Sequence, residues 1–203
     1  MKKKTWLIIA AVLVIVAGGV FTLLRLTGGS HTAIDRDPEP EVSGNSNVLV
    51  AYFSWSGNGQ QMADWIAEET GGDLTEEPYG DDFDSTASRA QTELNNETRP
   101  ALSTHIDPEV VAGYDVIYLG FPIWWYDLPT PVWSFLEEYD LSGKNIIPFF
   151  SHNGSSNGAN SLNRIAELAP DATVLADEAL SIRGSSVSGS EQQVKEWAAK
   201  FEN

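Results

Sequence analysis

Between residues 47 and 201, short apolar segments alternate with segments whose apolar residues recur at helical spacing. The run "NVLVAYF" (residues 47–53) is apolar and β-branched, which is typical of a buried strand. The segment "GQQMADWIAEETG" follows, and it places Met62, Trp65 and Ile66 on one helical face before a Gly-Gly pair. The pattern therefore predicts a strand and then a helix that ends at glycine.

The same alternation continues to the end of the chain, with short apolar runs between amphipathic ones. Further strands are expected at 73–78, 115–120, 144–150 and within 172–182, and further helices at 88–97, 129–140, 160–170 and 190–203. Strands joined by helices require right-handed crossovers, which give a mostly parallel sheet covered on both faces. We expect an α/β three-layer sandwich whose five-stranded parallel sheet has the order 2-1-3-4-5.

The N-terminal segment has a different character. Lys2, Lys3 and Lys4 precede twenty uncharged residues, 5–24, and Arg25 follows. A helix of that length spans about 30 Å, the hydrocarbon thickness of a bilayer. We expect one transmembrane helix, with the basic flank in the cytoplasm and the remainder on the extracytoplasmic side of the cytoplasmic membrane. The alternative is a signal peptide, with secretion after its cleavage.

The chain divides into an anchor or signal at 1–26, a flexible Gly-, Pro- and Ser-rich linker at 27–46 and a folded domain at 47–203. Beyond the anchor, 8 basic residues stand against 29 acidic ones, a net charge of −21. Such a surface repels nucleic acid and favours a basic partner, or it serves solubility. The chain has no cysteine, so disulfides and lipidation at cysteine are excluded.

Ligands of such sheets bind beyond the carboxyl ends of the strands, so the loops after residues 53, 120 and 150 are the candidate site. The first loop, "SWSGNGQ", joins a strand to a helix, where free N–H groups and the helix dipole favour an anion. It lacks the lysine of a Walker loop, and Met62 stands where a dinucleotide fingerprint needs its third glycine. The residues favour a monophosphate bound by hydroxyls and amides; a plain turn with a helix cap is the alternative.

The second loop, "GFPIWWYDLP", carries adjacent tryptophans, Trp124 and Trp125. Exposed tryptophans favour stacking on a flat heterocycle, and the alternative is packing onto the core or onto a partner protein. The third loop, "FFSHNGSSNGAN", supplies hydroxyl, imidazole and amide groups. Its Gly154–Gly158 segment formally matches a nucleophile elbow, but Ser156 lies six residues after the strand and no histidine follows it. We therefore predict no catalytic residue, and scattered histidines predict no metal site.

A phosphate loop, a tryptophan loop and a polar glycine loop in this order resemble the flavodoxin family. The chain is similar in particular to bacterial flavodoxin-like proteins that share a P-I-W-W loop and an H-x-G-S loop. The resemblance covers residues 47 to about 201 and implies FMN as the cofactor. It implies that the FMN phosphate lies on the first loop, at Ser54, Trp55, Ser56, Gly57, Asn58 and Gly59. The isoalloxazine would lie against the second loop, at Pro122, Ile123, Trp124 and Trp125. The far edge of the ring would lie along the third loop, at Ser151, His152, Asn153, Gly154 and Ser155.

The resemblance implies a membrane-tethered FMN-binding protein of electron transfer, whose partner is a redox protein or a quinone near the membrane. Two alternatives remain open: an FMN-dependent reductase of quinones or similar small acceptors, and a flavin-free module that docks proteins through its tryptophan loop. Gly59 favours the last, because family phosphate loops usually carry threonine there. The missing hydroxyl would remove one hydrogen bond, worth about 0.5–1.5 kcal/mol.

Overall fold

The computed structural model of the chain describes residues 47–77, 83–154 and 156–201. The expected anchor (1–26) and linker (27–46) lie outside these residues, so both remain predictions. Within the described ranges, no helix combines the length and the apolar character needed to cross a bilayer.

Apart from α3 and the division of the last strand into β5 and β6, the elements follow the predicted alternation. The strands are β1 (Val48–Phe53), β2 (Asp73–Glu77), β3 (Val116–Pro122), β4 (Asn145–His152), β5 (Thr173–Val174) and β6 (Leu180–Arg183). The α-helices are α1 (Asn58–Thr70), α2 (Phe83–Asn95), α3 (Pro108–Ala112), α4 (Thr130–Glu138), α5 (Ala159–Leu168) and α6 (Glu191–Ala198). Short 3₁₀ segments are η1 (Ala176–Glu178), η2 (Gly184–Gly189) and η3 (Ala199–Phe201).

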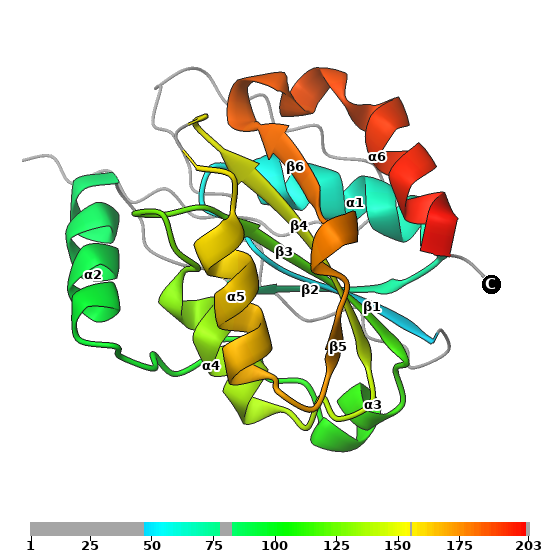
Figure 1. Ribbon diagram of the computed structural model, residues 1–203, viewed down its shortest axis with the longest axis horizontal. Coiled ribbons are helices and arrows are strands. Elements are labelled where there is room, and N and C mark those ends of the chain that lie inside the picture. The colour runs from blue at the N-terminus through cyan, green and yellow to red at the C-terminus, as the bar shows by residue number, and fades with distance from the viewer. Residues whose placement is uncertain (1–46, 78–82, 155, 202–203) are drawn as a thin grey trace, which may run out of the picture. The chain divides into compact units, whose positions relative to one another are not determined.

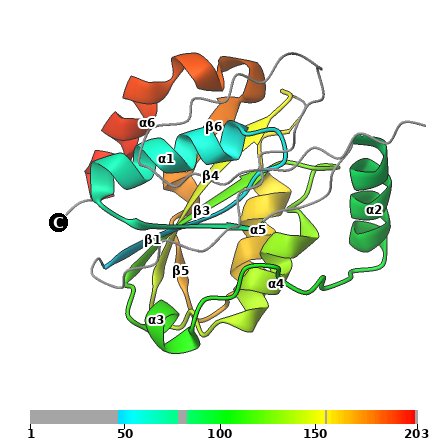
Figure 2. The ribbon, with the colours of Figure 1, turned by 180° about the vertical axis from the view of Figure 1, so that it is seen from behind.

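The described strands form one parallel sheet in the order β2-β1-β3-β4-β5, as predicted, and β6 also pairs with β4. Helices cover both faces of this sheet, α1 and α6 on one and α4 and α5 on the other (Figure 1 and, from behind, Figure 2). Side chains alternate between the two resulting cores: Leu49 and Phe53 of β1 pack on the α4 and α5 side, and Val50 and Tyr52 pack on the α1 and α6 side. This two-sided burial explains why the central strands β1, β3 and β4 are largely apolar.

The last strand, predicted within 172–182, is in fact two short strands. β5 pairs with the start of β4, and β6 pairs with its end, where Ser151 lies opposite Ile182 and His152 opposite Arg183. The 3₁₀ turn η1 separates them, and the Trp197 indole N–H donates to the Glu178 carbonyl at 2.7 Å. Periodicity could not predict this break, because the turn is held by a residue of the C-terminal helix. As a result, β6 brings a further loop to the carboxyl edge of the sheet.

Candidate functional site

The first predicted loop joins β1 to α1. Gly57 ends the loop with φ 83°, a left-handed conformation that suits glycine, and α1 begins at Asn58. The Ser54 hydroxyl oxygen is buried and has no hydrogen-bond partner among the described residues. A helix of 13 residues whose N-terminus adjoins an unpaired hydroxyl provides donors for an anion, so the loop fits a phosphate without a cation.

Gly59 has a structural reason to lack a side chain. A Cβ at this position would lie 3.1 Å from both the Phe53 carbonyl oxygen and the Ser54 Cβ, and 3.2 Å from the Ser54 hydroxyl. These contacts are tighter than ordinary van der Waals packing, so threonine would require the loop or Ser54 to move. The absence of a side chain at Gly59 thus leaves room for the buried side chain of Ser54.

The second loop forms a tight turn at the end of β3. The Trp124 N–H donates to the Asp127 carbonyl at 3.1 Å, and the Asp127 N–H donates to the Trp124 carbonyl at 2.9 Å. Trp125 and Tyr126 occupy the two central positions with φ of 46° and 65°, the signature of a type I′ turn. Glycine, asparagine or aspartate is preferred at such positions, so this turn stores backbone strain.

The two tryptophans have different environments. Trp124 is half-buried and meets Phe53 edge-on at 5.2 Å between ring centroids. Trp125 meets Trp124 edge-on at 6.0 Å and stays 41% exposed, and Tyr126 is 57% exposed. Trp124 therefore follows the core-packing alternative in part, whereas Trp125 and Tyr126 present aromatic surface to solvent at the turn.

The third loop begins with His152 at the end of β4. The Gly154 N–H donates to His152 Nδ1 at 2.8 Å, so Nδ1 is an acceptor and the hydrogen of the neutral imidazole lies on Nε2. The Arg183 guanidinium donates to the Asn153 carbonyl at 3.1 Å and holds the loop against β6. The Ser156 hydroxyl accepts from the Gly158 N–H at 3.1 Å and shapes the turn before α5.

These three loops and the segment after β6 line one cleft of about 630 Å³, within the size range of small-ligand sites. The cleft brings together ten of the predicted residues: Trp55, Ser56, Asn58, Pro122, Ile123, Trp124, Trp125, Ser151, His152 and Asn153. Ser54, Gly57, Gly59 and Gly154 belong to the same loops but are not among the lining residues, and Ser155 lies outside the described residues. The Ile123 N–H donates to the Ser151 carbonyl at 2.9 Å and fixes two of the loops to each other.

Six further residues line the cleft and were not predicted: Thr86, Ala87, Tyr126, Ser156, Gly184 and Ser185. Tyr126 and Ser156 are neighbours of predicted positions. Gly184 enters because β6 ends beside the first loop, and a Cβ there would lie 2.8 Å from the Asn58 amide nitrogen. Thr86 and Ala87 come from α2, whose polar sequence gave no sign that it borders a ligand site.

Among the residues that the structure describes, those that line the cleft include neither an acidic residue nor a lysine or arginine. Three of the described cations have partners outside the lining set or in the backbone: Arg164 donates to Asp127 and Glu167, Lys195 to Glu68 and Glu191, and Arg183 to the Asn153 carbonyl. The described lining residues therefore offer an anion neutral donors and the dipole of α1, and no cationic lysine or arginine side chain.

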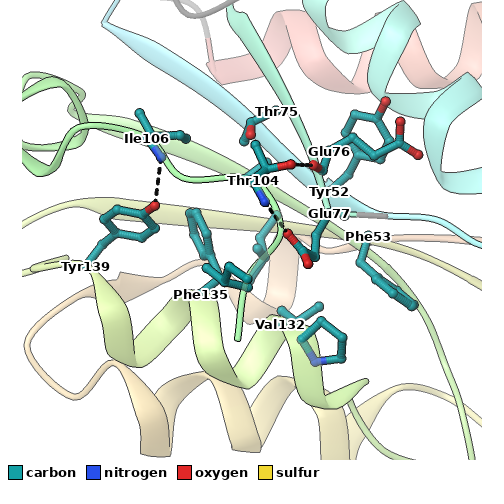
Figure 3. A pocket seen from close by; sticks show the side chains of 15 residues that line it. Tyr52, Phe53, Thr75, Glu76, Glu77, Thr104, Ile106, Val132, Phe135 and Tyr139 are labelled. Atoms are coloured by element: carbon teal, nitrogen blue, oxygen red, sulfur yellow. Dashed lines mark hydrogen bonds between the residues drawn. The ribbon is translucent and has the colours of Figure 1, made fainter. Parts of the chain in front are cut away.

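A second, much smaller cavity of about 30 Å³ lies between the sheet and α4 (Figure 3). The connection before α3 closes it: the Thr104 hydroxyl donates to the Glu76 carbonyl at 2.7 Å, and the Thr104 N–H donates to the Glu77 carboxylate at 3.1 Å. Burial raises the pKa of the Glu77 carboxyl, and the hydrogen bonds from the loop offset part of this rise. The volume suits about one water molecule and no organic ligand.

The fold and the cleft define a three-layer α/β protein with its ligand site at the carboxyl edge of a parallel sheet. A sequence model of the flavodoxin family matches residues 47–201, so the chain belongs to the flavodoxin family. This membership supports FMN as the expected cofactor. A comparison with curated proteins finds no match.

Solved structures agree on the fold. The chain is 31% identical to a flavoprotein candidate from Bacteroides uniformis ATCC 8492, with a TM-score of 0.60 over 76% of this chain and 98% of that one. A flavoprotein candidate from Bacteroides eggerthii DSM 20697 is 28% identical, with a TM-score of 0.55 over 74% and 98% of the two chains. The flavoprotein from Lactobacillus acidophilus NCFM, solved in complex with FMN, shares the fold at 24% identity and a TM-score of 0.54, over 70% and 96%.

Proposed function

We propose that the chain is a membrane-tethered flavodoxin-family protein that binds FMN and acts in electron transfer outside the cytoplasm. The observation that carries the proposal is the single cleft of about 630 Å³ in which the loops after β1, β3 and β4 meet. The membrane part rests on the sequence alone, on three lysines followed by twenty uncharged residues. Its partner would be a redox protein or a quinone near the membrane.

When bound, FMN supplies the redox chemistry, and the chain binds and orients it. The loop before α1 would hold the phosphate through backbone N–H groups and the hydroxyls of Ser54 and Ser56. The aromatic turn would hold the ring, with Trp125 as the accessible tryptophan. His152 offers Nε2–H as a donor to the edge of the ring, because the Gly154 N–H occupies Nδ1.

The first test is a visible absorption spectrum of the full chain in lipid nanodiscs, followed by titration with FMN and with riboflavin. We expect flavin bands and quenched FMN fluorescence, and much weaker binding of riboflavin, which lacks the phosphate. Equal affinity for the two would contradict the phosphate site, and no binding of either would contradict the flavin function.

Deletion of residues 1–26 should release the chain from the membrane fraction. A full-length chain that is found outside the membrane fraction would contradict the anchor.

An FMN-dependent reductase of small acceptors is the second candidate function. It is favoured by the extra wall of the cleft, formed by Thr86 and Ala87, which the resemblance to flavodoxins does not assign to the flavin. Steady consumption of NAD(P)H with a quinone acceptor would distinguish it from a carrier, which requires a protein donor. The flavin-free module remains the third candidate; Gly59, which favours it, also has a packing reason, because a Cβ there would lie 3.1 Å from the Ser54 Cβ.

A further inference from the structure

One buried hydroxyl beside the cleft has no hydrogen-bond partner within the described residues. It belongs to Thr86, which is 3% exposed, lines the cleft and lies in the first turns of α2. Most buried hydroxyls in native proteins are hydrogen-bonded, and one that is not lowers stability. A ligand in the cleft would supply the missing partner.

α2 lies on the side of the cleft where the aromatic turn is. Its Glu93 carboxylate accepts a hydrogen bond of 2.7 Å from the Thr130 hydroxyl, and Thr130 begins α4, directly after the turn. Both views show α2 beside α4 and away from α6 (Figures 1 and 2). Thr86 and Ala87 therefore extend the ring side of the cleft, and no predicted phosphate contact comes from this helix.

The charge around Thr86 and Ala87 disfavours an anion on the α2 side of the cleft. No described lysine or arginine lines the cleft, and Asp84 adds an exposed carboxylate to the first turn of α2. The chain beyond the anchor carries a net charge of −21. An uncharged ligand enters such a site without the repulsion that an anion meets.

We propose that Thr86 and Ala87, together with the aromatic turn, form a subsite for a flat, uncharged carbonyl compound, and that the Thr86 hydroxyl donates to its carbonyl oxygen. The proposal rests on the proposed function, since FMN would fill the rest of the cleft. A flat molecule suits the exposed aromatic surfaces of Trp125 and Tyr126. A donor at its carbonyl oxygen also stabilises negative charge that grows there when the compound accepts electrons.

The test measures binding of 1,4-naphthoquinone and of its 2-sulfonate by equilibrium dialysis. The full chain is used in nanodiscs, both without FMN and loaded with oxidised FMN, with empty nanodiscs as the blank. Thr86→Val removes the hydroxyl and keeps the shape. Thr92→Val is the matched control on the same helix, because the Thr92 hydroxyl is exposed and bonds to the Ser88 carbonyl at 2.8 Å.

We expect Thr86→Val to weaken naphthoquinone binding about three- to tenfold, as the loss of one hydrogen bond implies, and Thr92→Val to leave it unchanged. The sulfonate should bind more weakly than the neutral quinone. FMN affinity should be the same in all three chains, and the flavin-free Thr86→Val protein should melt a few degrees higher than wild type.

Unchanged naphthoquinone affinity in Thr86→Val would overturn the subsite. Loss of FMN affinity in this variant would also overturn it, because Thr86 would then serve the flavin. If the wild-type chain does not bind FMN at all, the proposed function fails, and the titration without FMN still decides the subsite by the same comparison of the two variants.

Discussion

The strained turn at the cleft predicts which of two substitutions at Tyr126, glycine or alanine, leaves the protein more stable. Tyr126 has φ 65° and is 57% exposed. Tyr126→Gly and Tyr126→Ala remove the same ring and the same exposed surface. They differ only in the Cβ, which clashes with the backbone in the left-handed region. Comparing the two variants therefore isolates the backbone strain at this one residue.

The expected difference follows from two opposing effects. A left-handed conformation costs a non-glycine residue about 1–2 kcal/mol, and alanine retains this cost. Glycine avoids this cost, but its greater freedom in the unfolded chain lowers the stability of the folded state by about 0.4–1 kcal/mol. The glycine variant should therefore be more stable than the alanine variant by about 0.5–1 kcal/mol. In a domain of this size the difference corresponds to about 1–4 °C in Tm.

The assay is thermal and urea unfolding of the two variants without FMN, followed by circular dichroism. Ser88, an exposed position inside α2, is the control, because glycine there should be less stable than alanine by about 1 kcal/mol. A Tyr126→Gly protein that is less stable than Tyr126→Ala would refute the reasoning, since the turn would then carry no strain. Both variants lack the ring, so they should bind FMN alike.

Three further changes test the packing behind the site. Gly120→Ala should destabilise the fold by about 1–3 kcal/mol or more in urea unfolding, because the new Cβ would overlap the Phe149 ring; wild-type stability would contradict this. Tyr114→Phe removes the hydrogen bond of 2.8 Å to the Asp73 carboxylate, so a loss of about 1.5–3 kcal/mol is expected in the same assay, and no loss would show the bond to be dispensable. Burial raises the pKa of Glu77, so the folded state binds the carboxyl proton more tightly than the unfolded state does. The stability of the wild type relative to Glu77→Gln should therefore fall as the pH rises from below 4.5 through the raised pKa, and stability that increases over this range would contradict the shift.

The central part of the fold could be predicted from the sequence because its signals are local. The apolar runs of β1, β3 and β4 and the loops that follow them are visible without any tertiary information, and ten of the residues predicted on these loops line the cleft. α3 was missed because five residues are too few to show helical spacing; its Asp107 cap, which accepts from the Glu109 N–H at 2.9 Å, was the available signal.

The other misses depend on contacts between distant segments. The break between β5 and β6 is held by Trp197. β6 in turn ends beside the first loop, where Gly184 lies next to Asn58. Thr86 reaches the cleft because α2 packs on α4, where Thr130 donates to Glu93. In each case the sequence pattern of the segment itself carries no information about the neighbour that places it.

The combination of an acidic chain and an uncharged cleft lining predicts an unusual salt dependence for FMN binding. A phosphate held by lysine or arginine binds more weakly as salt screens the attraction. Here no described cation lines the cleft, and the chain beyond the anchor carries a net charge of −21, so the long-range force on the phosphate is repulsive. Raising the ionic strength from 0.01 to 0.15 M shortens the Debye length from about 30 to about 8 Å and should strengthen FMN binding. Riboflavin, which has no phosphate, should show no such change, and FMN affinity that falls with salt would place a cation at the phosphate after all.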